Sequence, residues 1–188
     1  MRTAANICTF LRILLAPLFV WQLAAADSTA SGVPLAIYVA AALSDFVDGP
    51  LARTGGRVTW TGRLLDHGAD AVFLFPGLVV LSRAGRVPPL LPCAALLAFG
   101  LYCVHGWQRG RACGGIDLVA SRVGAAAGVA NYAVTGAAAG ALYVGRSPFD
   151  QAVYAAALFA GALNLLAAFE RAWNLRRPLL RASHAPDP

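Results

Sequence analysis

The stretch from Asp45 to Asp70 reads DFVDGPLARTGGRVTWTGRLLDHGAD, and it places four acidic side chains at the ends of two apolar segments. The whole chain of 188 residues contains only nine acidic residues, so four within this short stretch are a marked concentration. Charged side chains in helices that are otherwise apolar are energetically unfavourable, and they usually mark a functional site. The stretch therefore predicts a site where two helices end.

The composition on either side of this stretch indicates a membrane protein. Hydrophobic residues make up 59% of the chain and charged residues only 13%, and the mean hydropathy is +0.63. A soluble domain normally carries about a quarter charged residues, and a membrane-spanning helix needs about 20 apolar residues. We expect an all-α, polytopic membrane protein with six transmembrane helices, at residues 7–26, 34–53, 62–82, 88–107, 117–144 and 147–173.

The basic residues indicate the orientation of these helices. They are 15 arginines with no lysine, and the formal net charge is +6. With six spans, all but Arg83, Arg86 and Arg146 fall on the side of the N-terminus, which is the cytoplasmic side by the positive-inside rule. We expect both termini in the cytoplasm of a multi-pass cell-membrane protein, with the basic face beside anionic lipid and not nucleic acid.

No linker separates parts of the chain, so residues 1–188 are expected to form one transmembrane domain with a basic, irregular tail from about 176 to 188. A cleavable signal peptide ending near Ala26 is the alternative for the first segment. Asn6 and Arg12 interrupt its apolar core, which favours a retained helix. The pair Gly136 and Gly140 predicts a close helix contact, within one chain in preference to a dimer seam.

The spacing of the four aspartates predicts that they converge. Asp45 and Asp48 lie three residues apart and Asp66 and Asp70 four apart, so each pair shares one face of its helix. The two helices are antiparallel neighbours joined by a short loop, which puts both pairs at the same cytoplasmic depth. Four such carboxylates would repel one another, and a hard divalent cation such as Mg²⁺ takes oxygen ligands. A two-metal carboxylate site is therefore predicted.

The residues around these aspartates are those that phosphoryl transfer needs. Arg53 can bind phosphate oxygens in a bidentate way, and Gly49 and Gly62 leave room for a ligand near the backbone. Cations neutralise developing charge while a base takes a proton from the attacking hydroxyl, and Asp70 is the candidate base. The alternative is a set of interfacial aspartates that cap helices or pair with nearby arginines.

An acceptor pocket should open beside the metals, and a phosphorylated acceptor would bind arginine there. Arg109, Arg111 and Arg122 are the candidates, although the positive-inside pattern alone would also place them on this side. His105 and His67 are expected to be packed residues.

At the level of motifs the chain resembles the CDP-alcohol phosphatidyltransferases. Their pattern is Asp-x-x-Asp-Gly-x-x-Ala-Arg, eight residues, then Gly-x-x-x-Asp-x-x-x-Asp. Here it is filled by Asp45, Asp48, Gly49, Ala52, Arg53, Gly62, Asp66 and Asp70. The opening Asn6, Thr9 and Arg12, followed by Pro17, is similar to the phosphatidylglycerophosphate synthase and cardiolipin synthase branches. Ala71 after Asp70, where those branches often have lysine, and the absence of their Gly-Lys-x-Lys-Thr stretch are departures.

The resemblance implies a six-helix, homodimeric enzyme of phospholipid biosynthesis. It would transfer a phosphatidyl or related group from a CDP-linked donor such as CDP-diacylglycerol to an alcohol, and release CMP. Two Mg²⁺ or Mn²⁺ ions would be held by Asp45, Asp48, Asp66 and Asp70, with Asp70 also activating the acceptor hydroxyl. The donor pocket would be formed by Gly49, Ala52, Arg53 and Gly62, with Asn6 and Thr9 beside them.

Several interpretations remain open from the sequence. The acceptor is expected to be a glycerol-phosphate-type alcohol, with inositol or inositol phosphate as the alternative. A divalent-cation transporter would also have inward-facing acids, but it gives no role to the Gly-x-x-Ala-Arg element. A structural protein that recruits anionic lipid is the third class.

Overall fold

The computed structural model describes residues 2–25, 31–53, 60–110, 121–144 and 149–182, with side chains placed for 10–25, 31–44, 64–110, 121–144 and 149–176. Six α-helices account for nearly all of these residues, and no strand occurs among them. The helices are α1 (Arg2–Ala25), α2 (Val33–Arg53), α3 (Trp60–Arg83), α4 (Leu90–Gly110), α5 (Arg122–Val144) and α6 (Phe149–Ala182). The predicted all-helical class is confirmed.

Four helical segments among the described residues are long and apolar enough to cross a membrane. They are Leu64–Arg83, Leu90–Gly110, Arg122–Val144 and Phe149–Arg176. The described apolar parts of α1 and α2 are shorter, Phe10–Ala25 and Val33–Ser44. A multi-pass membrane protein is therefore supported, while the expected total of six spans stays a prediction.

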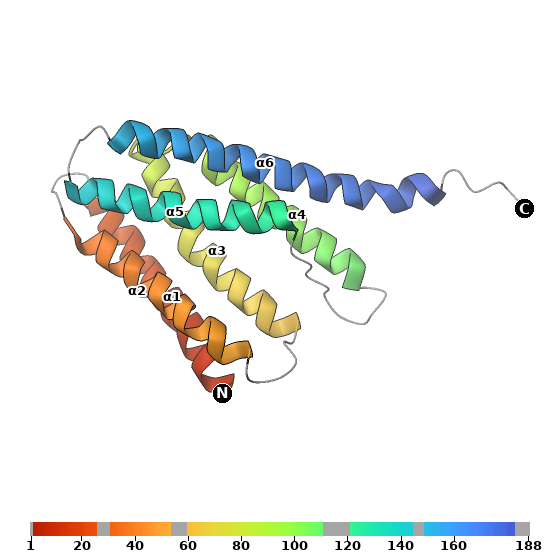
Figure 1. The fold of residues 1–188 in the computed structure, drawn as a ribbon, viewed down its shortest axis with the longest axis horizontal. Helices are drawn as coiled ribbons and strands as arrows, with labels where there is room; N and C mark the ends of the chain where they lie inside the picture. Colours follow the sequence, from red (N-terminus) through yellow and green to blue (C-terminus); the bar gives the residue numbers. More distant parts are fainter. Residues whose placement is uncertain (1, 26–30, 54–59, 111–120, 145–148, 183–188) are drawn as a thin grey trace, which may run out of the picture.

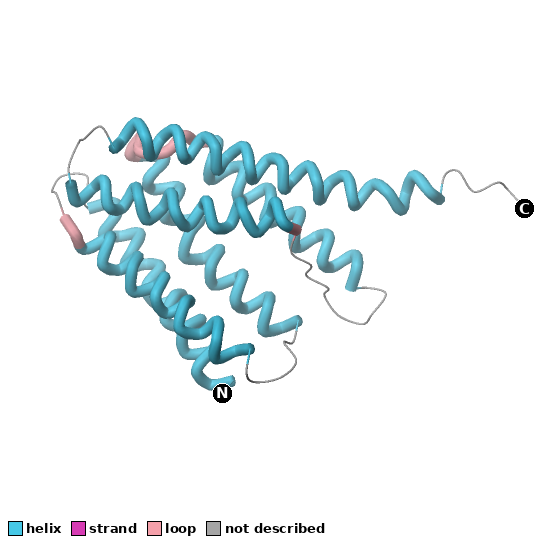
Figure 2. Tube along the Cα trace, in the orientation of Figure 1, coloured by secondary structure: helices cyan, strands magenta, loops and turns pink. Residues whose placement is uncertain are grey.

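The helices come together at one end of the molecule and spread apart at the other (Figure 1). The tube in Figure 2 shows the same arrangement, with α6 extending well past the other helices toward the C-terminus. At about 1.5 Å per residue, the 34 residues of α6 measure roughly 50 Å. This is longer than the hydrocarbon core of about 30 Å. The tail was expected to be irregular from about residue 176, and this is wrong for 176–182, because α6 continues through Pro178 to Ala182.

At the converging end, α3 stops in a Schellman turn. Gly85 has a φ of +71°, its N–H donates to the Ser82 carbonyl at 3.0 Å, and the Arg86 N–H donates to the Leu81 carbonyl at 2.9 Å. Glycine is suited to this left-handed position because it has no Cβ. The Arg86 guanidinium then binds Asp150 in the first turn of α6, with an N–O distance of 3.0 Å. The turn thus links α3 to the beginning of α6.

The core next to this end is aromatic and aliphatic. The Phe19 ring of α1 stacks on Phe73 of α3 with centroids 4.8 Å apart, and both side chains are fully buried. Leu78 and Leu81 of α3 and Leu91 of α4 belong to the same buried cluster. The same cluster includes Ile37 of α2, Val134 of α5 and Val153 of α6, so the core joins all six helices.

Helix α5 approaches α2 through Gly136. A Cβ built on this glycine would lie 2.5 Å from the Tyr38 ring, and one built on Gly140 would lie 4.0 Å from Leu35. The Tyr38 hydroxyl also donates to the Tyr132 carbonyl at 2.7 Å. The small-residue pair Gly136 and Gly140 therefore faces α2 of the same chain, as the favoured prediction stated.

Candidate functional site

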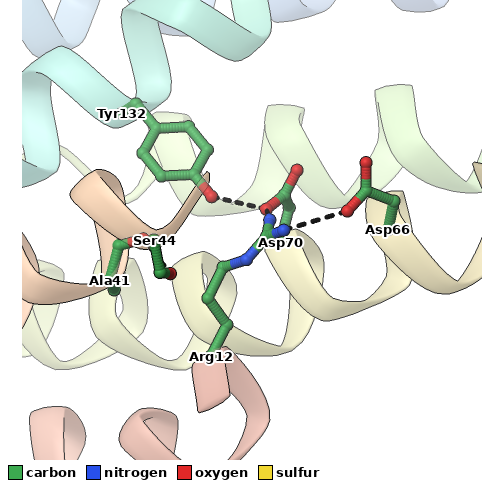
Figure 3. Close-up of polar contacts among 6 residues, drawn as sticks. All are labelled: Arg12, Ala41, Ser44, Asp66, Asp70 and Tyr132. Atoms are coloured by element: carbon green, nitrogen blue, oxygen red, sulfur yellow. Dashed lines mark hydrogen bonds and ion pairs between the residues drawn. The ribbon is translucent and has the colours of Figure 1, made fainter. Parts of the chain in front are cut away.

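A buried arginine lies among the acidic residues at the spreading end of the bundle. Arg12 projects from α1, its side chain is 1% exposed, and its guanidinium binds two carboxylates of α3. One nitrogen donates to Asp66 at 2.9 Å and another to Asp70 (Figure 3). The burial of Arg12 places this polar side chain of the first helix inside the bundle.

Asp66 and Asp70 lie one helical turn apart, and their contact with the same guanidinium shows that they share a face. The Asp66 side chain is 55% exposed and that of Asp70 is 25% exposed. Tyr132 of α5 donates its hydroxyl to the same Asp70 oxygen that Arg12 binds, at 2.6 Å. Asp70 is therefore held from α1 and α5 together, whereas Asp66 keeps more open surface.

These two carboxylates have the chemistry of a hard-cation site. Both converge on one positive group, Arg12, so the protein already balances their charge with a cation. Carboxylate oxygens are also the ligands that Mg²⁺ and Mn²⁺ prefer. The two carboxylates are of the ligand type that suits a divalent ion, but no cluster of three ligating side chains occurs among those that the structure places, so the metal site stays a prediction.

The other motif residues are positioned only through their helices. Asp45, Asp48, Gly49, Ala52 and Arg53 lie in the last turns of α2, and Gly62 lies in the first turn of α3. Their side chains, and those of Asn6 and Thr9 in α1, are outside the described part of the chain. Ser44, directly before Asp45, donates its hydroxyl to the Ala41 carbonyl at 2.7 Å and is drawn in the same close-up (Figure 3). The roles of the motif residues on α2 and of Gly62, Asn6 and Thr9 stay predictions.

A cavity of about 520 Å³ begins at Asp70 and extends between four helices. Its walls come from α3, α4, α5 and α6, together with Ser121 directly before α5. Most lining residues are alanine, glycine, leucine or phenylalanine, such as Leu74, Phe75 and Phe99. The chamber is mainly apolar, but besides Asp70 and Tyr132 its lining includes six polar or charged residues, His67, Tyr102, Ser121, Asn131, Asn164 and Arg171.

Arg171 supplies the positive charge in this cavity. It projects from α6, is 6% exposed, and lies 3.3 Å from the Nδ1 atom of His105. Its guanidinium carbon lies 5.0 Å from the centre of the Tyr102 ring, a cation–π distance. His67 meets the same Tyr102 ring edge-on, with centroids 5.6 Å apart. His67 is nevertheless exposed and lines the cavity, and His105 is partly exposed, so the expectation that both histidines are packed is wrong for His67.

A pair of buried amides forms another wall of the cavity. Asn131 of α5 and Asn164 of α6 exchange hydrogen bonds at 2.8 and 3.3 Å, and Asn164 also donates to the Ala160 carbonyl at 2.8 Å. Buried amides of this kind are stable only when their donors and acceptors are matched. The pair therefore ties α5 to α6 where the cavity begins.

The predicted acceptor arginines that the structure describes, Arg109 and Arg122, do not line this cavity. Arg109 is exposed in the last turn of α4, and Arg122 is exposed at the start of α5. Neither lines the cavity, and Arg111 is outside the described residues. Sequence reasoning missed Tyr132 and Arg171 as site residues. Arg171 had a usable signal, because it is a charged residue inside the long apolar segment of α6.

Comparison of the sequence with known proteins identifies a family. The family model described as CDP-alcohol phosphatidyltransferase matches residues 2–170. A cardiolipin synthase (CMP-forming) of Streptomyces coelicolor is 32% identical over 99 residues, which cover 51% of this chain and 46% of the relative. A Mycobacterium tuberculosis protein named "Probable phosphatidylglycerophosphate synthase" is 37% identical over 87 residues, 45% of this chain and 42% of the relative.

A third relative has a name that states its donor and acceptor. The CDP-diacylglycerol–glycerol-3-phosphate 3-phosphatidyltransferase of Rickettsia felis is 29% identical over 93 residues, 50% of this chain and 51% of the relative. The chain spans about half the length of the curated relatives it matches.

Proposed function

The chain belongs to the CDP-alcohol phosphatidyltransferase family, and on this premise we propose that it is an integral membrane transferase of phospholipid biosynthesis. It moves a phosphatidyl or similar substituted phosphate group from a CDP-linked donor, such as CDP-diacylglycerol, to the hydroxyl of an alcohol. CMP is the second product.

The observation that carries this proposal is that Asp66 and Asp70 both bind the guanidinium of Arg12. Two carboxylates at the spreading end of an apolar bundle, one of them beside a cavity, supply a charged reaction centre next to a substrate chamber. A transporter would need polar groups along its whole path. Here the walls beyond Asp70 are mainly apolar.

Within this proposal Asp45, Asp48, Asp66 and Asp70 hold two Mg²⁺ or Mn²⁺ ions. When bound, such ions neutralise negative charge on the phosphate oxygens. Arg12 contacts both described carboxylates and limits their mutual repulsion, while Tyr132 fixes the orientation of Asp70.

Asp70 is the proposed base. Its carboxylate takes the proton of the acceptor hydroxyl, and the acceptor oxygen forms a new bond to the phosphorus that bears the lipid. The bond from that phosphorus to the oxygen of CMP breaks, and CMP leaves with the electron pair. No oxidant or further co-reactant is needed, because one phosphate ester bond replaces a diphosphate bond.

The donor is expected on the α2 side of this centre. Arg53 would bind the diphosphate, and Gly49, Ala52 and Gly62 would allow the nucleotide to approach the backbone. Asn6 and Thr9 would lie beside it. These residues belong to the family motif or, for Asn6 and Thr9, to the N-terminal pattern that is similar to the phosphatidylglycerophosphate synthase and cardiolipin synthase branches.

A glycerol-phosphate-type alcohol is the proposed acceptor, in keeping with the names of the relatives. Inositol or inositol phosphate is the alternative. Arg109, Arg111 and Arg122 would attract a phosphorylated acceptor toward the mouth of the site. The proposal also includes six spans, cytoplasmic termini, a cytoplasmic active site in the cell membrane, and a homodimer.

The direct test is CMP release by the purified protein in detergent or nanodiscs. CDP-diacylglycerol is supplied with glycerol 3-phosphate, phosphatidylglycerol, inositol, inositol phosphate, serine or choline, each with Mg²⁺, Mn²⁺ or EDTA. We expect CMP release that needs both an acceptor and a divalent ion. Release that ignores both, or metal flux into liposomes without donor, would contradict the proposal.

A further inference from the structure

We propose that the cavity between α3, α4, α5 and α6 holds a lipid acceptor, a glycerophospholipid whose headgroup ends in a hydroxyl. Its phosphodiester binds Arg171, its headgroup hydroxyl reaches Asp70, and its acyl chains leave the bundle along the apolar wall. The inference rests on the proposed transfer reaction and narrows its acceptor from glycerol phosphates in general to a membrane lipid.

The position of the cavity separates it from the donor. None of its lining residues comes from α1 or α2, whereas the motif residues expected at the nucleotide lie on α2 and the first turn of α3. Asp70 borders the cavity and also contacts Arg12 of α1. A base in this position lies between the two substrates, so the chamber on the α4–α6 side is the one for the acceptor.

Arg171 provides the phosphate end of the chamber. The guanidinium is almost completely buried, yet it borders the cavity and is oriented by Tyr102 and His105. A planar guanidinium binds phosphate oxygens well. One arginine matches the single charge of a phosphodiester, whereas a phosphate monoester carries about −1.5 to −2 near neutral pH.

The remaining walls suit hydrocarbon. Leu74, Phe75 and Phe99 offer no hydrogen bonds to a small hydrated phosphate. The volume of about 520 Å³ lies in the range of roughly 300–1,000 Å³ that is typical of sites for drug-sized ligands.

The cavity also reaches the surface that faces lipid. Val129 lines it and is 71% exposed on α5, a helix long and apolar enough to span the membrane. Hydrocarbon chains at this depth can therefore continue directly from the cavity into the bilayer. A lipid can enter without leaving the membrane, and this argues for a lipid acceptor over a soluble one.

A substitution at Gly128 tests whether a lipid binds in the cavity without disturbing the fold. It lines the cavity, and a Cβ built on it would have nothing within 4 Å, so a larger side chain would grow into the chamber. Gly100 on α4 is the matched control, because its Cβ would also meet nothing within 4 Å and it does not line the cavity. The variants are Gly128→Leu and Gly100→Leu.

The first measurement is steady-state CMP release with phosphatidylglycerol and, separately, with glycerol 3-phosphate. We expect phosphatidylglycerol to be the better acceptor, and Gly128→Leu to raise its KM about tenfold or more while Gly100→Leu changes it less than twofold. Arg171→Gln should also raise the phosphatidylglycerol KM about tenfold, the size expected for a lost charge-assisted hydrogen bond, with the donor KM unchanged. Efficient transfer to glycerol 3-phosphate but not to phosphatidylglycerol would overturn the inference and leave the proposed reaction intact.

The second measurement does not depend on activity. Native mass spectrometry of the protein in detergent, titrated with phosphatidylglycerol, should show bound lipid that Gly128→Leu reduces at least fivefold and Gly100→Leu does not. If no acceptor supports CMP release, the proposed reaction fails, and the lipid site is judged on this binding alone. Equal lipid binding by Gly128→Leu and Gly100→Leu would overturn the proposed lipid site.

Discussion

The two ends of the bundle are built from opposite kinds of contact. At the closed end, defined by the turn from Leu81 to Arg86 and the start of α6, the helices meet through a Schellman turn and one ion pair above an aromatic core. The helices spread toward the other end (Figure 1). We call the group formed by Arg12, Asp70 and Arg171 with the adjacent cavity the open end, and both of its arginines are buried.

This difference separates stability from function. Apolar packing and a capped turn need no ligand to be stable, so the closed end can hold the helices together by itself. Buried charge is unfavourable unless partners compensate it, and at the open end Arg12 is paired with Asp66 and Asp70 while Arg171 lies beside His105 and the cavity where the proposed function puts a substrate. Substitutions at the open end should therefore mainly change activity, and those at the closed end mainly stability.

The largest effect is expected for Asp70→Asn. The amide keeps the shape of the side chain and can still accept from Tyr132, but it cannot take the proton of the acceptor hydroxyl. CMP release should fall about 100-fold or more, within the range of general-base catalysis, while CDP-diacylglycerol and Mn²⁺ still bind. Asp150→Asn makes the same change at the closed end and should keep nearly full activity. An Asp70→Asn enzyme with more than a tenth of normal activity would refute the base assignment.

Next is Arg12→Met, which removes the shared cation from Asp66 and Asp70 with little change in length. We expect a loss of about 1–3 kcal/mol in unfolding free energy in EDTA, because the part-buried Asp70 loses a charged partner. Thermal unfolding in detergent measures this, and added Mg²⁺ should recover more stability in the variant than in the wild type. Arg176→Met, on an exposed position of α6, is the control. Equal unfolding temperatures for the two variants would show that Arg12 does not balance the aspartates.

Gly136→Ala tests the close contact between α5 and α2. The new Cβ would lie 2.5 Å from the Tyr38 ring, so the ring must move and weaken its hydrogen bond to Tyr132. We expect a loss of about 1–2 kcal/mol in unfolding free energy, typical of overpacking. Gly100→Ala has open space and should unfold at the wild-type temperature or slightly above. A stable Gly136→Ala protein would mean that α2 and α5 do not pack as described.

The smallest effect is expected for Arg86→Gln at the closed end. Its ion pair with Asp150 is partly exposed, and such pairs contribute about 0–1 kcal/mol. Thermal unfolding should change only slightly and CMP release should not change. A loss of activity comparable to that of Arg12→Met would contradict the division between the two ends.

Much of this organisation could be predicted from local sequence patterns. The helices follow from long apolar runs, and their boundaries fall within five residues of the expected ones except at the end of α6, which continues nine residues past 173 to Ala182. The pairing of Asp66 with Asp70 follows from a spacing of four residues. The inward direction of Arg12 follows from the cost of exposing a charge to lipid.

Other features depended on packing between distant segments. Tyr132 meets Asp70 only because α5 is rotated so that Gly136 can approach Tyr38, and no local pattern specifies that rotation. Arg171 reaches the cavity because Asn131 and Asn164 hold α6 against α5. The tail was expected to be irregular after residue 176 from its prolines, yet α6 continues through Pro178.

By itself the sequence determined the all-helical membrane class, the family and the spacing of the motif aspartates, because each depends on residues near one another in the chain. Only the tertiary structure decided which groups surround Asp70 and where the cavity beside it lies. Those properties depend on the relative rotation and spread of six helices, which are set by contacts between residues far apart in sequence, such as Arg12 with Asp66 and Asp70.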